Sequence, residues 1–253
     1  MEDFIHLHVH THYSILDGQS KIPHLVDKAV KDGMRGMAIT DHGVMYGIKE
    51  FADYCAGINK KRKKEGLEPF KPIFGCEMYV AHHRKENKSA SDGDKSGYHL
   101  IVLAKNYQGY KNLIKLVSRA WTDGFYFKPR TDRQDLEKFH EGLIVCSACI
   151  AGEVPAKILQ GDIAGAREAI EWHRRVFGED YYLEIQRHEV KDPNQRANRE
   201  TFPLQQRANK VILELAKEYG IKVVCTNDCH FEDKDTAEAH DHLLCLSTNK
   251  KLD

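Results

Sequence analysis

The stretch that decides the expected fold runs from residue 4 to residue 42 and reads FIHLHVHTHYSILDGQSKIPHLVDKAVKDGMRGMAITDH. Its first seven residues alternate apolar side chains with three histidines, the period of a strand whose two faces differ. An apolar stripe over residues 22–30 then predicts a helix, with Ser20 as its cap and Gly33 at its end. Residues 37–40 form a short apolar run that ends in Asp41 and His42. Strand, helix and strand follow one another here, as they do in α/β folds.

The same alternation continues through the rest of the chain. Further strands are predicted at residues 72–80, 100–104, 143–149, 182–185 and 223–226, and further helices at residues 48–64, 107–120, 163–177 and 204–219. About seven strands, most of them separated by helices, favour the α/β class and a parallel β/α barrel over an open doubly wound sheet. The polar residues 81–97 are predicted to form an exposed loop. Because no linker-like segment divides the 253 residues, we expect residues 1–253 to be one domain.

The composition limits the classes of protein to which the chain can belong. Its 38 Lys and Arg balance 38 Asp and Glu, so any contact with DNA must be local rather than the result of an overall positive charge. Candidates for phosphate contacts are residues 60–64 and the group Lys128, Arg130 and Arg133, which could equally be a solvated helix end and a loop. Seven cysteines, no secretory leader and no apolar stretch of about 20 residues predict reduced thiols, a cytoplasmic location and no membrane partner.

Histidines and acidic residues at the ends of predicted strands point to metal chemistry. His8 and His10 lie two residues apart on the first predicted strand, so they project to the same side about 6 to 7 Å apart. That spacing suits two ligands of one ion. The same kinds of side chain recur in loops and after strands, at Asp17, His42, Asp228 and His230. Fifteen histidines in one chain strengthen this interpretation.

Three further residues add ligands of other kinds. Glu77 lies inside an apolar run, where an unpaired carboxylate would cost several kcal/mol, so it needs a cation as its partner. His99 opens an apolar run, and Cys149 follows Cys146 at a spacing of three. These two cysteines could instead be half of a zinc ribbon, but the chain has no second Cys-x-x-Cys. The full set exceeds what one tetrahedral ion can use, which predicts two or three divalent ions suited to hydrolysis of a phosphate ester.

Six segments carry a resemblance to a known family: residues 6–14, 39–43, 75–79, 98–103, 146–149 and 226–231. They resemble the motifs of the polymerase and histidinol phosphatase (PHP) family, in the order in which that family has them. Residues 128–130, 182–188, 239–245 and 249–250 lie outside these motifs. They resemble more closely the family members at the N-terminus of the bacterial DNA polymerase III α subunit. The resemblance covers essentially the whole chain and implies a distorted, TIM-like barrel of seven strands.

The resemblance also implies a metal centre of two or three divalent ions, zinc, manganese or iron. Its nine ligands would be His8, His10, Asp17, His42, Glu77, His99, Cys149, Asp228 and His230. One ion would be held by His8, His10, Glu77 and Asp228, a second by Glu77, His99 and Cys149, and a third by Asp17, His42 and His230. We expect Asp17, His42 and Asp228 to take the most direct part in catalysis.

The activity implied by the resemblance is metal-dependent hydrolysis of the last phosphodiester at the 3′ end of a DNA primer, a proofreading 3′–5′ exonuclease. The partners would be DNA, the remaining polymerase domains of a longer chain and other replisome subunits. The carboxylates that synthesise DNA are not identifiable here. Two other functions are compatible with the same residues: a structural module that uses metal to stabilise a polymerase, and a phosphomonoesterase similar to histidinol phosphatase.

Several side chains support two interpretations each. Asp41 could orient His42 or serve a turn, and His6 and His12 could support the ligands from behind or fill the core. The aromatic group in residues 121–127 could stack on the bases of a frayed primer end or pack against other parts of a protein.

Overall fold

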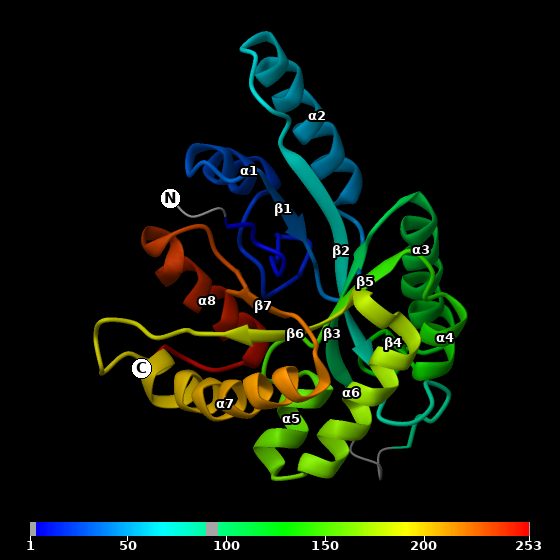
Figure 1. The fold of residues 1–253 in the computed structure, drawn as a ribbon. Coiled ribbons are helices and arrows are strands. Elements are labelled where there is room, and N and C mark those ends of the chain that lie inside the picture. Colours follow the sequence, from blue (N-terminus) through cyan, green and yellow to red (C-terminus); the bar gives the residue numbers. More distant parts are fainter. Residues whose placement is uncertain (1–3, 90–95, 253) are drawn as a thin grey trace. The chain divides into compact units, whose positions relative to one another are not determined.

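The computed structural model describes residues 4–89 and 96–252, and its contacts divide the chain into two compact units. The terminal unit combines residues 1–76 and 228–253, and the central unit contains residues 77–227. Figure 1 shows the helices and strands of both units in the order of the chain. The expectation of a single domain over residues 1–253 stays a prediction.

The terminal unit contains the strand and helices expected from the opening stretch. Its elements are α1 (Ile22–Lys31), β1 (Gly36–Ile39), α2 (Ile48–Lys64), the first part of β2 (Lys71–Val80), the short turn η4 (Lys234–Thr236) and α8 (Ala237–Thr248). β1 pairs in parallel with β2, with Gly36 opposite Lys71 and Ile39 opposite Phe74. Every residue of β1 is buried, as is the apolar stripe of α1. The core of this unit therefore lies where β1 and α1 turn their apolar side chains inward.

The central unit contains the end of β2 and the later strands. Its elements are β3 (Tyr98–Ala104), α3 (Tyr107–Thr122), β4 (Arg130–Thr131), α4 (Arg133–Lys138), β5 (Leu143–Cys146), α5 (Glu153–Gln160), α6 (Ile163–Phe177), η2 (Gly178–Asp180), β6 (Tyr181–Gln186), η3 (Ala197–Thr201), α7 (Phe202–Tyr219) and β7 (Val223–Thr226). Parallel pairs join β2 to β4, β5 to β6 and β6 to β7. The hydrogen-bonded order of the sheet is β1-β2-β3-β5-β6-β7, with β4 beside β2.

The α/β class is confirmed, and the sheet has seven strands, although the unpredicted β4 takes the place of the strand predicted at residues 4–10. Helices α2 and α6 and strand β7 have the predicted bounds. The expectation that all strands are parallel is wrong for β3, which runs antiparallel to β5. The alternation of apolar residues cannot distinguish the two directions, since side chains alternate in the same way in both. The short helices α4, α5 and α8 were not predicted.

The first predicted strand, residues 4–10, is also wrong as a regular strand. Within it only Val9 forms a bridge, to Cys229. The backbone is extended and hydrogen-bonded on both sides: the Thr40 amide donates to the Val9 carbonyl at 2.8 Å, and the His10 amide donates to the Cys229 carbonyl at 2.7 Å. The alternating pattern therefore identified extended backbone correctly. It could not show that, within residues 4–10, only Val9 forms a bridge.

The start of α1 differs from the prediction as well. Lys21 rather than Ser20 precedes the helix, and its side chain makes no capping hydrogen bond. The Ser20 hydroxyl is buried and has no hydrogen-bond partner among residues 4–89 and 96–252. Pro23 lies in the first turn, where its fixed φ suits the helix and its missing amide proton costs nothing. Gly33, with a φ of 79°, ends the helix as predicted.

The predicted exposed loop at residues 81–97 is described only in part, because residues 90–95 lie outside the described residues. Most of the described loop residues are exposed, but Lys85 is buried. No helix within residues 4–89 and 96–252 combines the length and the apolar character needed to cross a bilayer.

Candidate metal centre

One pair of backbone segments brings four of the predicted ligands together in the terminal unit. The Val9–Cys229 bridge is parallel, and the Cys229 amide donates to the His8 carbonyl at 3.1 Å. Side chains on either side of a bridged residue in extended backbone project to the same face. His8 and His10 therefore lie beside Asp228 and His230, which flank Cys229 in the same way.

Asp228 lies at the centre of the first cluster. Its Oδ1 atom is 3.0 Å from His8 Nε2, 3.3 Å from His10 Nε2 and 3.1 Å from His230 Nε2. Burial opposes ionisation of the Asp228 carboxyl, but its interactions with His8, His10 and His230 outweigh this effect, so its pKa lies well below the ordinary value. Three imidazole nitrogens thus surround one carboxylate oxygen, and all four atoms are directed at the same small region.

A second cluster forms around Asp17. Its Oδ2 atom lies 2.6 Å from His42 Nε2 and 3.4 Å from His230 Nδ1. Burial raises the pKa of Asp17, but the hydrogen bond with His42 and the charges of His230 and His42 outweigh this effect and lower the pKa to about 2. The His230 ring stacks on His10, with centroids 4.3 Å apart and planes 8° apart. His230 therefore contacts both clusters.

His240 of α8 was given no role by the sequence and yet joins the second cluster. Its Nε2 atom lies 2.9 Å from the Asp17 carbonyl oxygen, and its ring is 5.7 Å from the His230 ring. Burial lowers the pKa of His240. The signal that could have found it is the histidine-rich segment 239–245, which carried part of the family resemblance. A neutral ring that donates to the Asp17 carbonyl fixes the loop that presents Asp17.

Each of the two clusters has one residue with a strained backbone conformation. Leu16, which precedes Asp17, has a φ of 63°, and Asp228 has a φ of 49°. Residues with side chains adopt this left-handed region rarely, and such conformations gather at functional sites. Both departures serve to direct a carboxylate toward histidines of the same unit.

The central unit holds the other three predicted ligands together. Glu77 of β2 is 1% exposed, and its Oε1 lies 2.8 Å from Nδ1 of His99, on β3. Cys149 lies in the turn after β5, and its Sγ atom is 4.0 Å from Glu77 Oε1 and 3.6 Å from His99 Nδ1. Ala148, with a φ of 62°, provides the sharp turn that directs Cys149 toward this pair. A carboxylate, an imidazole and a thiol thus meet at one point.

These donor sets fit divalent metal ions. In the terminal unit, ring nitrogens and carboxylate oxygens lie within 4.8 Å of one another in three groups: His8, His10 and Asp228; His10, His42 and His230; and Asp17, His230 and His240. Imidazole, carboxylate and thiolate together accept zinc, manganese or iron. Within each unit, residues that the family resemblance assigns to one ion are neighbours. That Glu77 shares an ion with His8, His10 and Asp228 stays a prediction.

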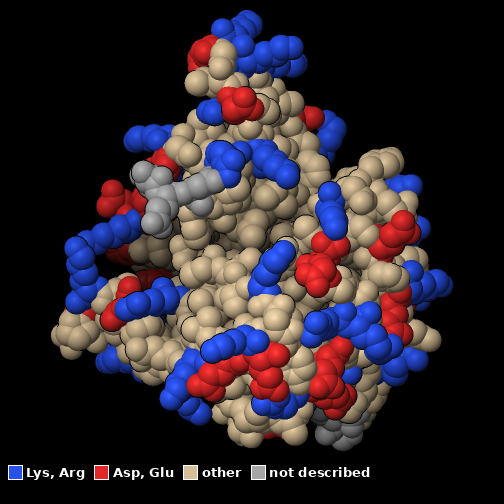
Figure 2. All heavy atoms as spheres, in the orientation of Figure 1, with Lys and Arg blue, Asp and Glu red and all other residues tan. Residues whose placement is uncertain are grey.

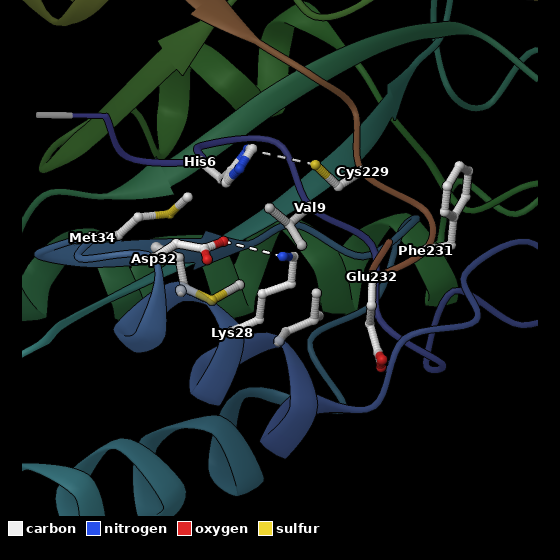
Figure 3. A pocket seen from close by; sticks show the side chains of 11 residues that line it. His6, Val9, Lys28, Asp32, Met34, Cys229, Phe231 and Glu232 are labelled. Carbon is white, nitrogen blue, oxygen red and sulfur yellow. Dashed lines mark hydrogen bonds and ion pairs between the residues drawn. The ribbon is translucent and has the colours of Figure 1, made fainter. Parts of the chain in front are cut away.

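His6 does not share the surroundings of His8 and His10. It lines a pocket of the terminal unit with Cys229, and its Nδ1 lies 3.5 Å from Cys229 Sγ. Figure 3 shows Met34, Phe231 and the Lys28–Asp32 ion pair around the same pocket. Burial lowers the pKa of His6. His6 therefore packs away from the ligand clusters, while His12 is exposed.

One of the predicted phosphate contacts is wrong. Arg130 is 0% exposed, and its guanidinium donates to the carbonyls of Lys85 and Asn87 at 3.1 and 2.8 Å. A side chain enclosed in this way cannot reach DNA. Lys128 is exposed, and the basic residues 60–64 end α2, where Figure 2 shows several Lys and Arg side chains together. Over the rest of the visible face, basic and acidic side chains are mixed, as the zero net charge predicts.

The aromatic group in residues 121–127 is largely at the surface. Trp121, Phe125 and Phe127 are 42%, 44% and 63% exposed, and the rings of Trp121 and Phe125 stack 5.4 Å apart. These three side chains are therefore not part of the core of their unit. Stacking on bases and packing against another domain both stay predictions.

Comparison with known proteins agrees with the resemblance. The PHP domain family matches residues 6–188. A curated protein named DNA polymerase III subunit alpha from Borreliella burgdorferi is 43% identical over 248 residues, covering 98% of this chain and 20% of its own length. One of the same name from Treponema pallidum is 41% identical over 248 residues, covering 98% of this chain and 19% of its own length.

Among solved structures, histidinol phosphate phosphatase from Lactococcus lactis, complexed with zinc, L-histidinol and phosphate, aligns with a TM-score of 0.45 and 15% identity. The alignment covers 96% of this chain and 93% of that one. The chain spans about a fifth of the length of the curated relatives that it matches. Since the family match covers most of its residues, the chain belongs to the PHP domain family.

Proposed function

We propose that this chain is the PHP domain of a DNA polymerase III α subunit, and that it binds divalent metal ions and hydrolyses the phosphodiester at the 3′ end of DNA. The observation that supports metal binding most directly is the position of Asp228. One carboxylate oxygen cannot accept good hydrogen bonds from three imidazoles at once, because it has two lone pairs. An ion placed among the same atoms would satisfy all of them.

We propose all nine predicted residues as metal ligands: His8, His10, Asp17, His42, Asp228 and His230 in the terminal unit, and Glu77, His99 and Cys149 in the central unit. We propose two or three ions of zinc, manganese or iron. Bound divalent ions supply an activated water at neutral pH and neutralise charge on the phosphoryl oxygens.

The residues of the terminal unit differ in what they can do, because they differ in exposure. The His8 and His10 side chains are 0% exposed, so they can hold an ion but cannot contact a substrate. The Asp17 and His42 side chains are 31% and 18% exposed. These two side chains can therefore reach both an ion and a bound phosphate. Asp228 holds its histidines in the orientation that binding needs.

A DNA substrate is proposed from the relatives, whose name is that of a DNA polymerase subunit. DNA, the remaining domains of a polymerase chain and other replisome subunits are the proposed partners. The zero net charge requires local contacts. The exposed basic residues at the end of α2 and the exposed aromatic residues of α3 and the following turn are the proposed places for them.

The test is to measure bound metal and hydrolysis on the same preparation. Metal content is determined after purification, and the chain is then assayed on a mismatched primer–template, on single-stranded DNA and on an aryl phosphate. The variant Asp17→Ala is compared with Asp53→Ala, which removes an exposed carboxylate of α2. We expect bound metal, DNA hydrolysis, and loss of that hydrolysis in the Asp17 variant only.

Other outcomes separate the alternatives. If the aryl phosphate is cleaved briskly while DNA stays intact, the chain is a phosphomonoesterase. If metal is bound and raises stability but neither substrate is cleaved with zinc, manganese or iron, the role of the metal is structural. A chain that takes up no metal at all contradicts the proposal.

A further inference from the structure

We infer that Asp41 and Ser14 are positioning residues that hold His10 in the tautomer with its proton on Nδ1, so that Nε2 faces the ligand cluster with its lone pair. This inference rests on the proposed metal site and adds to it two residues outside the nine-ligand set. It follows from counting the hydrogen-bond donors and acceptors around the Ser14 hydroxyl, which lies between Asp41 and His10.

Asp41 is the anchor of this arrangement. It directly follows Thr40 at the end of β1, and it is 2% exposed. Its Oδ1 accepts hydrogen bonds from the Thr11 amide at 2.6 Å and the Ser14 hydroxyl at 2.8 Å, and its Oδ2 accepts one from the Thr11 hydroxyl at 2.9 Å. A carboxylate has no proton to donate. The amide of Thr11 can only donate, which fixes the direction of the bond to Oδ1.

The Ser14 hydroxyl then determines which ring nitrogen of His10 carries the proton. Its hydroxyl has one proton and two lone pairs. The proton is used toward Asp41, because two oxygens 2.8 Å apart with no proton between them would repel. One lone pair accepts from the His42 amide at 3.2 Å. The remaining lone pair faces His10 Nδ1, 2.9 Å away, so that nitrogen must carry the proton.

The other ring nitrogen of His10 then has the character that a metal ligand needs. In a neutral imidazole with its proton on Nδ1, Nε2 carries the lone pair. That atom is the one directed at the cluster, 3.3 Å from Asp228 Oδ1. A hydrogen bond to the distal nitrogen both selects the tautomer and fixes the plane of the ring. His10 is 0% exposed, so bulk solvent does not reach this ring.

The same loop supplies a matched control. Ser20 is buried to the same extent as Ser14, at 1% exposure, but its hydroxyl has no hydrogen-bond partner within the described residues. Ser14→Ala and Ser20→Ala therefore remove the same atom from equally buried places, and only the first interrupts the connection from Asp41 to His10.

The experiment measures zinc affinity by competition with a chelating dye, and the protonated ring nitrogens by ¹⁵N–¹H spectra of the zinc-free chain. We expect Ser14→Ala to weaken zinc binding by about 10- to 100-fold, in the range found for groups that support a ligand from behind. Ser20→Ala should bind within about twofold of wild type. In wild type the His10 signal should show a proton on Nδ1 and none on Nε2. Thermal unfolding in chelator shows whether each variant is folded.

The outcomes separate this inference from the function on which it rests. A wild-type chain that binds no zinc overturns both. If wild type binds zinc and Ser14→Ala binds it equally well, the metal site stands and the positioning role is wrong. If Ser14→Ala does not fold, the wild-type spectrum alone decides, since a His10 that carries its proton on Nε2 overturns the inference.

Discussion

The buried guanidinium of Arg130 allows a sharp test of stability against function. Arg130→Met keeps the apolar stem of the side chain but removes donors to the carbonyls of Gly124, Lys85 and Asn87, the first of them a long contact at 3.4 Å. A hydrogen bond from a charged donor contributes about 1.5 to 3 kcal/mol, and the loss of these bonds is partly offset because the desolvation of a buried charge is also removed. We expect the free energy of unfolding to fall by about 3 kcal/mol, or roughly 6 to 12 °C in Tm for a chain of this length.

The assay is chemical and thermal unfolding followed by circular dichroism, with Lys128→Met as the control. Lys128 is exposed, and its Nζ atom lies over the Tyr79 ring at 5.3 Å from the centroid, so its loss should cost less than about 1 kcal/mol. DNA affinity should not change in folded Arg130→Met. If this variant is as stable as Lys128→Met and instead binds DNA more weakly, the structural role assigned to Arg130 is refuted.

Three further predictions concern stability. His173 is buried, and burial lowers its pKa to about 4, so the unfolded chain binds a proton there more readily than the folded chain does. The free energy of unfolding of wild type should therefore fall by about 2 kcal/mol between pH 7 and pH 5. Urea titrations of His173→Phe should lack this dependence on pH. Gly109→Ala should lower the free energy of unfolding by about 1 to 3 kcal/mol, because its Cβ would meet the Gly142 carbonyl oxygen at 1.7 Å. The Cβ of Gly57→Ala on α2 would meet nothing within 4 Å, so this variant should raise the free energy of unfolding by up to about 1 kcal/mol. Equal values for the two variants in denaturant melts would contradict this. Zinc at about 100 times its Kd should stabilise the chain by about 2.7 kcal/mol in calorimetry, and an unchanged Tm would count against a specific site.

The sequence predicted best where periodicity is strong and local. The first turns of α2 have an apolar face and its last turn is basic, the β7 run is bounded by polar residues, and both elements have the predicted ends. The short α4 and α5 have too few turns for a period to be recognised. The antiparallel direction of β3 depends on which strand it pairs with, which no local pattern carries. Residues 4–10 look like a strand because they are extended, and only their hydrogen-bond partners show otherwise.

The candidate site shows the same division. Residue type and spacing pointed to His8, His10 and Asp228 as ligands, because imidazoles and carboxylates at alternate positions of extended backbone can converge on one ion. The supporting residues were harder to find, since a serine or an aspartate in a loop is ordinary. The role of Ser14 can be inferred only from its distances to Asp41 and His10. A support of this kind is defined by its contacts rather than by its type.

The conformation of Asp228 links the backbone to the chemistry. At a φ of 49°, glycine would be without strain and asparagine would be tolerated well, so the turn alone does not require an aspartate here. Its carboxylate is what the three surrounding imidazoles need, and burial makes that charge costly in the absence of such partners. The strain of the left-handed residue, about 1 to 3 kcal/mol, and the desolvation of the carboxylate both oppose folding of this segment. Both are offset where the Val9–Cys229 bridge fixes the backbone and the histidines supply the compensating interactions, so the proposed ligands also stabilise the fold of this segment.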